Sequence, residues 1–400
     1  MTIREAYKLA AFVLVFLAFR IGYIQYSEPA SFMQSDSYGY VDLAKSAFSP
    51  GGMQMSGLRS FRMPGYPLFL SAVFHVFGES VAAVQAAQIL LSLLSCWFLF
   101  KISEHYLDKR TAWLVLFLLA VSYDAFSQDA MVLSESLYVS IVLAAFYFLL
   151  RGKTLASGLL FAAGYFIRQE ILVFMLLAAG AAWVKKAPRK AALFLLPLVL
   201  FLAVWGARNY SVTGRFFTGT TASYRHLYYS NVYVFERLGW KAAGGLEQMP
   251  AGLDEFRQDE VRKGWCAAMF SQQPLYALLA APFIKLAFFI YPFLPAFDLT
   301  FMWILPFWLY GMALLWKNAG EHWQLYGMFA VLAALAAVFH AIPRTRGIFY
   351  PFILIFAARA LGTLWNRGGR QKAWLALWTA ANVGVYFLQA PVRALLKTFL

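Results

Sequence analysis

A few carboxylates lie at the edges of long apolar segments, where an ionisable side chain is costly unless it has a function. Asp36 lies in Asp36-Ser-Tyr38-Gly-Tyr40, soon after the first apolar segment, and Glu135 opens another apolar run within Ser134-Glu135-Ser136. A carboxylate at the membrane edge can take a proton from a hydroxyl group, so both are candidates for acid–base catalysis. The alternative for Asp36 is a solvated residue that caps a short helix.

Arginines accompany these carboxylates near the ends of apolar segments. A guanidinium binds phosphate through two parallel hydrogen bonds, so several that converge would suit a phosphate or pyrophosphate group. Each has a simpler alternative, such as a lipid-headgroup contact for Arg62 or a local pair with Glu170 for Arg168. The candidate phosphate ligands are Arg62, Arg168, Arg208, Arg344 and Arg346. Nearby candidates for contact with the rest of a substrate are Tyr38, Tyr40, Tyr66, Asn209, Arg225 and His226.

The elements that must position these residues are membrane helices. Of the 400 residues, 62% are hydrophobic and 13% are charged, against about 45–50% and about 25% in soluble domains. A soluble enzyme, a nucleic-acid-binding domain and a disordered chain are thereby excluded. We predict an all-α polytopic membrane protein with about 11 spans (roughly 10–13). The expected spans are 7–26, 81–102, 112–127, 130–150, 154–168, 170–184, 191–208, 299–316, 325–341, 348–365 and 373–390.

The basic residues orient these spans. The sequence holds 34 Lys and Arg against 19 Asp and Glu, and the short basic loops fall on one side if the N-terminus is cytoplasmic. Residues 1–400 then form a single membrane domain with two extracytoplasmic segments. The first, 27–80, carries juxtamembrane helices; the second, 209–298, includes a broken or interfacial helix at 274–297. The candidate arginines lie on the outer side, where the positive-inside rule does not place them.

Metal and disulfide signals are weak. The two cysteines, Cys96 and Cys266, are far apart, and the five histidines are scattered without metal-ligand spacing. We therefore assign no metal ligand and no cofactor, and leave a divalent cation open. Asp124 and Asp129 are expected to lie in a solvated turn.

The order of the motifs resembles that of the polytopic GT-C glycosyltransferases, in the bacterial branch akin to protein O-mannosyltransferases and lipid A aminoarabinose transferases. The matching pieces cover most of the chain. They are Asp36-Ser-Tyr38-Gly-Tyr40, Arg62-Met-Pro-Gly-Tyr66-Pro67, Ser134-Glu135-Ser136, Arg168, Trp205-Gly-Ala-Arg208-Asn209-Tyr210, Thr213-Gly214-Arg215 and Arg344-Thr-Arg346.

The resemblance implies transfer of a sugar from a polyprenyl-phosphate donor to an acceptor hydroxyl, in the bacterial inner membrane and on its outer side. Asp36 would be the general base, Glu135 the second acidic residue and the arginines the ligands of the donor phosphate. The acceptor would be a glycan, a lipid or a protein, and nucleic acid is not an expected partner. Two alternatives remain: a lipid-linked glycan polymerase or ligase, and a transporter or flippase.

Overall fold

The protein is described by a computed structural model that covers residues 3–49, 52–239, 249–293, 297–339 and 343–397. Within these ranges the chain is helical, and two isolated bridges take the place of any strand. The prediction of an all-α protein is confirmed. The expected span 325–341 and the expected segments 209–298 and 274–297 each extend partly outside the described residues.

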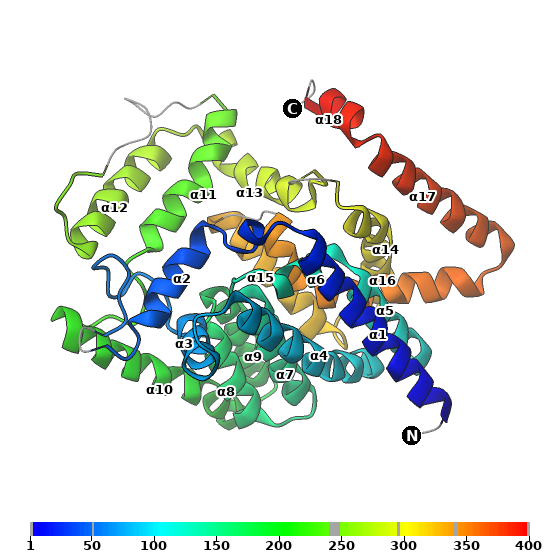
Figure 1. Ribbon diagram of the computed structural model, residues 1–400, viewed down its shortest axis with the longest axis horizontal. Helices are drawn as coiled ribbons and strands as arrows, with labels where there is room; N and C mark the ends of the chain where they lie inside the picture. The colour runs from blue at the N-terminus through cyan, green and yellow to red at the C-terminus, as the bar shows by residue number, and fades with distance from the viewer. Residues whose placement is uncertain (1–2, 50–51, 240–248, 294–296, 340–342, 398–400) are drawn as a thin grey trace.

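The first half of the chain builds most of the bundle (Figure 1). Its α-helices are α1 (Ile3–Tyr26), α2 (Ser35–Lys45), α3 (Gly65–Phe77), α4 (Val81–Tyr106), α5 (Lys109–Val121), α6 (Tyr123–Ala130), α7 (Glu135–Leu150), α8 (Thr154–Tyr165), α9 (Leu172–Val184) and α10 (Pro188–Thr213). Short 3₁₀ turns precede α2 and α9: η1 (Pro29–Phe32) and η2 (Gln169–Ile171).

The second half adds α16, around which the core is organised, and the pair α17 and α18 at the periphery. Its elements are α11 (Ser223–Arg237), α12 (Glu255–Ser271), α13 (Leu275–Ile290), α14 (Leu299–Trp316), α15 (Trp323–Val338), η3 (Pro343–Thr345), α16 (Arg346–Asn366), α17 (Gly369–Phe387) and α18 (Gln389–Lys397). In Figure 1, α17 and α18 stand outside the bundle, beyond α14 and α16.

Within the part of the chain that the structure describes, five helical segments are long and apolar enough to cross a membrane: α1, α4, α10, α14 and the continuous stretch from η3 through α16. Two bent pairs, α5 with α6 and α12 with α13, raise the number to seven if each pair is one span. The helices α7, α8, α9 and α15 are apolar but shorter. The prediction of about eleven spans therefore remains a prediction.

The expected spans 112–127 and 130–150 differ from the observed helices in a way that shapes the site. The expected span 112–127 is broken, because α5 ends at Val121 and the chain turns by 54° into α6. The next helix begins only at Glu135, not at 130. The break keeps the short helix α6 and the start of α7 together at one end of the bundle, and both carry acidic residues of the site.

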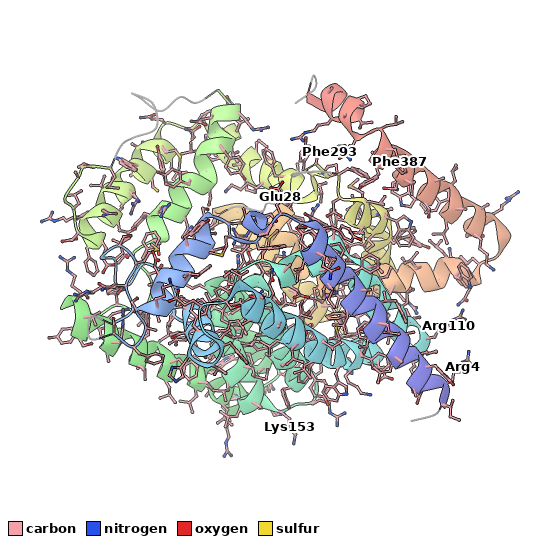
Figure 2. All side chains as sticks on the ribbon, viewed as in Figure 1. Arg4, Glu28, Arg110, Lys153, Phe293 and Phe387 are labelled. Carbon is pink, nitrogen blue, oxygen red and sulfur yellow. The ribbon has the colours of Figure 1, made fainter. Side chains whose placement is uncertain are left out.

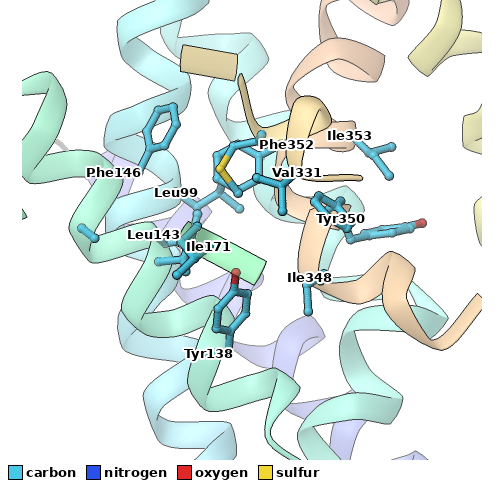
Figure 3. Close-up of a cluster of buried hydrophobic side chains, with 14 of the residues drawn as sticks. Leu99, Tyr138, Leu143, Phe146, Ile171, Val331, Ile348, Tyr350, Phe352 and Ile353 are labelled. Atoms are coloured by element: carbon cyan, nitrogen blue, oxygen red, sulfur yellow. The ribbon is translucent and has the colours of Figure 1, made fainter. Parts of the chain in front are cut away.

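The core is organised around α16, because most residues in the apolar part of the stretch Pro343–Asn366 are buried. Figure 3 shows side chains of α7, among them Tyr138, Leu143 and Phe146, gathered with Ile348 and Phe352 of α16. The packing of α16 against α7 brings η3, which precedes α16, next to the start of α7, where Arg344 pairs with Glu135.

The loops with basic residues lie away from this end of the bundle. In Figure 2, Arg4, Arg110 and Lys153 lie along the lower and right-hand edges, whereas Glu28, just after α1, lies above them. Lys109 also forms an ion pair with Glu5 near the start of α1. The bundle thus separates the short basic loops from the segment that carries Asp36.

Candidate active site

Six charged side chains from five separate segments meet at one end of the bundle and form a continuous series of ion pairs. Arginines and carboxylates alternate along it, and each link has a nitrogen–oxygen distance of 3.0 Å or less. We call this series the ion-pair chain. In order, it consists of Arg62, Asp36, Arg344, Glu135, Arg168 and Glu170.

Asp36 lies between two arginines. Its Oδ1 accepts a hydrogen bond from Nη2 of Arg62, and its Oδ2 accepts one from Nη1 of Arg344, both at 2.8 Å. Burial alone would raise the pKa of the Asp36 carboxyl, but the charges and hydrogen bonds of Arg62 and Arg344 hold that pKa well below its usual range. The side chain is 33% exposed, so solvent and ligands can reach it.

Glu135 is the buried member of the ion-pair chain, with 1% of its side chain exposed. Its Oε1 accepts from Nε of Arg344 at 2.8 Å and from Nη1 of Arg168 at 3.0 Å. Its Oε2 is buried and has no hydrogen-bond partner within the described parts of the chain. Arg168 also bonds Glu170 at 2.5 Å, so the local pair and the long-range pair exist together.

The starts of helices place these groups. Asp36 and Glu135 lie in the first turns of α2 and α7, where the helix dipole stabilises negative charge. Gly65 brings the segment of Arg62 to the end of α8: its amide donates to the carbonyl of Phe166 at 2.7 Å. A Cβ at Gly65 would lie 2.5 Å from that oxygen, so a larger residue would separate the two segments.

Tyr40 and Tyr66, two of the expected substrate contacts, are buried and form a packed series with Arg62. The Arg62 guanidinium lies 4.7 Å from the ring centre of Tyr40, which in turn packs edge-on against Tyr66 at 4.9 Å. The Tyr66 hydroxyl donates to Oε1 of Gln88 at 2.8 Å. Tyr40 and Tyr66 are 8% and 0% exposed, whereas Tyr38 is 60% exposed and remains available for a ligand.

Arg208 and Asn209 lie outside the ion-pair chain and hold the segment that leads to Arg62. Arg208 donates to the carbonyl of Arg59 at 2.7 Å and to that of Met53 at 3.0 Å. Asn209 accepts from the Ser60 hydroxyl at 3.0 Å. These contacts join the end of α10 to residues 53–60. Arg208 and Asn209 therefore anchor residues 53–60 and do not contact the ion-pair chain.

Arg346 lies only two residues from Arg344 but belongs to a different cluster. Its guanidinium pairs with Asp124 at 3.2 Å and with Asp298 at 2.9 Å, and it is 2% exposed. The structure therefore separates Arg346 from the phosphate ligands expected with it. Its partners explain why: one acid comes from α6 and the other caps α14.

Arg225 and His226 lie on the first turns of α11, and both are exposed. The guanidinium of Arg225 lies 5.2 Å from the ring centre of Phe61, the neighbour of Arg62. The second expected segment therefore reaches the border of the site through Arg225.

The sequence did not predict the buried pair of Arg20 with Asp129, and the exposure of two acids was misjudged. Arg20 pairs with Asp129 at 2.7 Å, and the two side chains are 0% and 4% exposed. The expectation of solvated aspartates was wrong, because Asp124 and Asp129 are both buried against arginines from other helices. A charge inside the apolar α1 was the available signal for Arg20.

The carboxylates of the ion-pair chain leave few free oxygens for a divalent cation. Such a cation takes several oxygen or nitrogen ligands, but three of the four oxygens of Asp36 and Glu135 already accept from guanidinium groups. Among the described residues, no group of three or more His, Cys, Asp and Glu side chains lies together. As arranged, these residues do not fit a divalent cation, and the arginines fit an anion.

Comparisons with known proteins find one matching family and several solved structures of similar fold. Residues 62–208 match the family described as dolichyl-phosphate-mannose-protein mannosyltransferase. The chain has the fold of the oligosaccharyltransferase of Archaeoglobus fulgidus in a complex with zinc and sulfate. Its TM-score is 0.54 and its identity 17%, over 94% of this chain and 51% of the other.

The same archaeal protein, AglB, solved with an inhibitory peptide and a dolichol-phosphate, gives a TM-score of 0.51 and 14% identity over 98% of this chain and 56% of that one. The chain thus spans about half the length of these structures. ArnT of Cupriavidus metallidurans bound to undecaprenyl phosphate gives a TM-score of 0.40 and 10% identity over 90% of this chain and 78% of the other. The sequence has no match among curated proteins. The resemblance to GT-C membrane glycosyltransferases is confirmed.

Proposed function

We propose that the protein is a membrane glycosyltransferase that moves a sugar from a polyprenyl-phosphate donor to an acceptor hydroxyl on the extracytoplasmic side. The observation that carries this proposal is the solvent-accessible carboxylate of Asp36 held between the guanidinium groups of Arg62 and Arg344. A base and cations for a leaving phosphate are thereby in direct contact. The family match and the fold shared with a protein solved with a dolichol-phosphate support the same class of donor.

In the proposed reaction, the acceptor oxygen attacks the anomeric carbon while the bond from that carbon to the phosphate oxygen breaks. The acceptor proton passes to Asp36, and the electron pair of the broken bond stays on the lipid phosphate. Arg344 and Arg62, with Arg168 behind them, stabilise the charge that develops on the phosphate. Glu135 holds Arg344 and Arg168 in place through its Oε1.

The proposal has a consequence for the free protein. Nη1 of Arg344 donates to Asp36 in the free protein, so a donor phosphate that binds Arg344 would compete with that carboxylate. When the phosphate takes Arg344, Asp36 loses one of its two cationic partners and becomes a stronger base. Donor binding would therefore prepare the base for the acceptor.

The test is the release of undecaprenyl phosphate, measured by mass spectrometry, from undecaprenyl-phosphate-linked sugars incubated with purified protein and extracted membrane acceptors. Asp36→Asn should abolish release while the variant still binds undecaprenyl phosphate in native mass spectrometry. Turnover near the wild-type rate by Asp36→Asn would refute the assignment. A requirement for a diphosphate-linked oligosaccharide would indicate a ligase or polymerase. Lipid movement without any product would indicate a transporter.

A further inference from the structure

One short segment includes Glu135 and contacts both Arg344 and the residues that precede Asp36. Residues 128–136, which we call the hub segment, run from the end of α6 to the start of α7 and include Glu135. Nε2 of Gln128 donates to the backbone carbonyl of Arg344 at 2.9 Å. The amide of Val132 donates to the carbonyl of Phe32 at 3.0 Å, four residues before Asp36. The hub segment thus sets the spacing between the two carboxylates and Arg344.

Asp129 anchors the hub segment. Its Oδ1 accepts from the hydroxyl of Ser136 at 2.5 Å, and its Oδ2 accepts from Nε of Arg20 at 2.7 Å. Ser136 is the neighbour of Glu135, so this carboxylate ties the start of α7 to α1. Gln88 of α4 adds hydrogen bonds to the carbonyls of Asp129 at 3.0 Å and Met131 at 2.8 Å.

Arg20 is the other half of the anchor and is fully buried in α1. Its Nη1 donates to the carbonyls of Phe16 at 3.2 Å and Ala120 at 3.3 Å, so the guanidinium joins α1 to the end of α5. A buried ion pair is usually no more stabilising than apolar residues that fill the same space. Stability alone therefore does not explain why two charges occupy this position.

We propose that Arg20 and Asp129 are positioning residues for the site: together they fix the hub segment, and through it the distances between Asp36, Glu135 and Arg344. The inference rests on the proposed function for its effect on catalysis. It does not need that function for its effect on structure. Neither residue touches a reacting group, so both act through Ser136, Gln128 and Val132.

The main test removes the pair without leaving a lone buried charge. In Arg20→Met/Asp129→Leu the apolar side chains should keep the thermal unfolding temperature near the wild-type value, whereas either single change can prevent folding. We expect kcat to fall by at least about tenfold with little change in the donor KM, because groups misplaced by about 1 Å lose rate. The acid limb of the pH profile should also move, since Arg344 is no longer held against Asp36. Arg20→Lys, which retains the charge, should recover part of kcat.

A second variant cuts only one link of the same arrangement. A Cβ at Gly347 would lie 1.9–2.1 Å from the amide group of Gln128, so Gly347→Ala must push that group away from the Arg344 carbonyl. We expect a loss of kcat similar in direction and smaller in size. Gly180→Ala in α9 is the matched control, because a Cβ there meets no atom within 4 Å.

Hydrogen–deuterium exchange separates this inference from the proposed function. The double variant should exchange faster than wild type in residues 32–38 and 343–347, whether or not turnover is detected. Unchanged exchange in both segments, or a kcat and pH profile equal to those of Gly180→Ala in both test variants, would overturn the positioning role. Faster exchange with no transferase activity in the wild type would instead retain the coupling and refute the proposed function.

Discussion

Donor saturation should raise the pKa of Asp36, because the donor phosphate draws Arg344 away from it. In the free protein each carboxylate oxygen accepts from one arginine at 2.8 Å. One arginine at this distance lowers the pKa of an aspartate by about 1–3 units. Since solvent screens a side chain that is one-third exposed, we expect the lower part of that range, about 1–2 units or roughly 1.4–2.7 kcal/mol.

The pH dependence of initial rates measures this change. The acid limb of kcat/KM for the donor reports Asp36 in the free protein, and the acid limb of kcat reports it in the donor complex. A depressed pKa keeps the carboxylate ionised to lower pH, so the limb of kcat/KM should lie about 1–2 units below the limb of kcat.

Two variants show whether Arg344 causes the separation. In Arg344→Gln there is no guanidinium to lose, so the two limbs should coincide even though the rates are lower. Arg59→Gln is the matched control: Arg59 lies on the same segment as Arg62 but bonds the carbonyl of Val212 at 3.0 Å, so the separation should persist. Coincident limbs in the wild type, or an undiminished separation in Arg344→Gln, would refute the competition between phosphate and carboxylate.

Three further outcomes follow from the same contacts. Tyr38→Cys should react with a membrane-impermeant maleimide added outside intact cells, because Tyr38 is exposed and both native cysteines are buried; labelling only after lysis would contradict the outer placement. Arg208→Ala should lower the free energy of unfolding by about 1–3 kcal/mol, because hydrogen bonds to backbone carbonyls are lost. Thermal unfolding measures this loss, and the affinity for undecaprenyl phosphate should stay unchanged. Weaker affinity at wild-type stability would indicate that Arg208 binds the phosphate after all. EDTA should leave undecaprenyl phosphate binding unchanged, because guanidinium groups hold the anion; a loss restored by Zn²⁺ or Mg²⁺ would show that a cation completes the site.

The sequence predicted the helical class and most of the ion-pair chain for a physical reason. Apolar runs of membrane length mark helices directly, and charges at their ends are few enough to stand out. Asp36, Glu135, Arg62, Arg168 and Arg344 were all identified in this way, and the structure brings them together. Their convergence depends on which helix ends are neighbours, and this follows from the packing around α16.

The sequence could not assign each arginine to its partner. Arg344 and Arg346 are two residues apart, yet one faces Asp36 and the other is enclosed by Asp124 and Asp298. The difference comes from acids that lie far away in the chain. Tyr40 and Tyr66 show the same limit: aromatic residues near a charged site are expected at a ligand, but here they pack behind Arg62.

The pairing of these arginines changes what the charge excess means. The sequence suggested outer arginines that converge on a phosphate, but the ion-pair chain holds three arginines against three carboxylates and is formally neutral. A phosphate that enters such a site competes with these carboxylates for the guanidinium groups. The most accessible link is the one between Arg344 and Asp36, whose side chains are 30% and 33% exposed. Under the proposed function, exchange at that link would bind the leaving group and release the base in one step, and the neutrality of the site would connect donor recognition with catalysis.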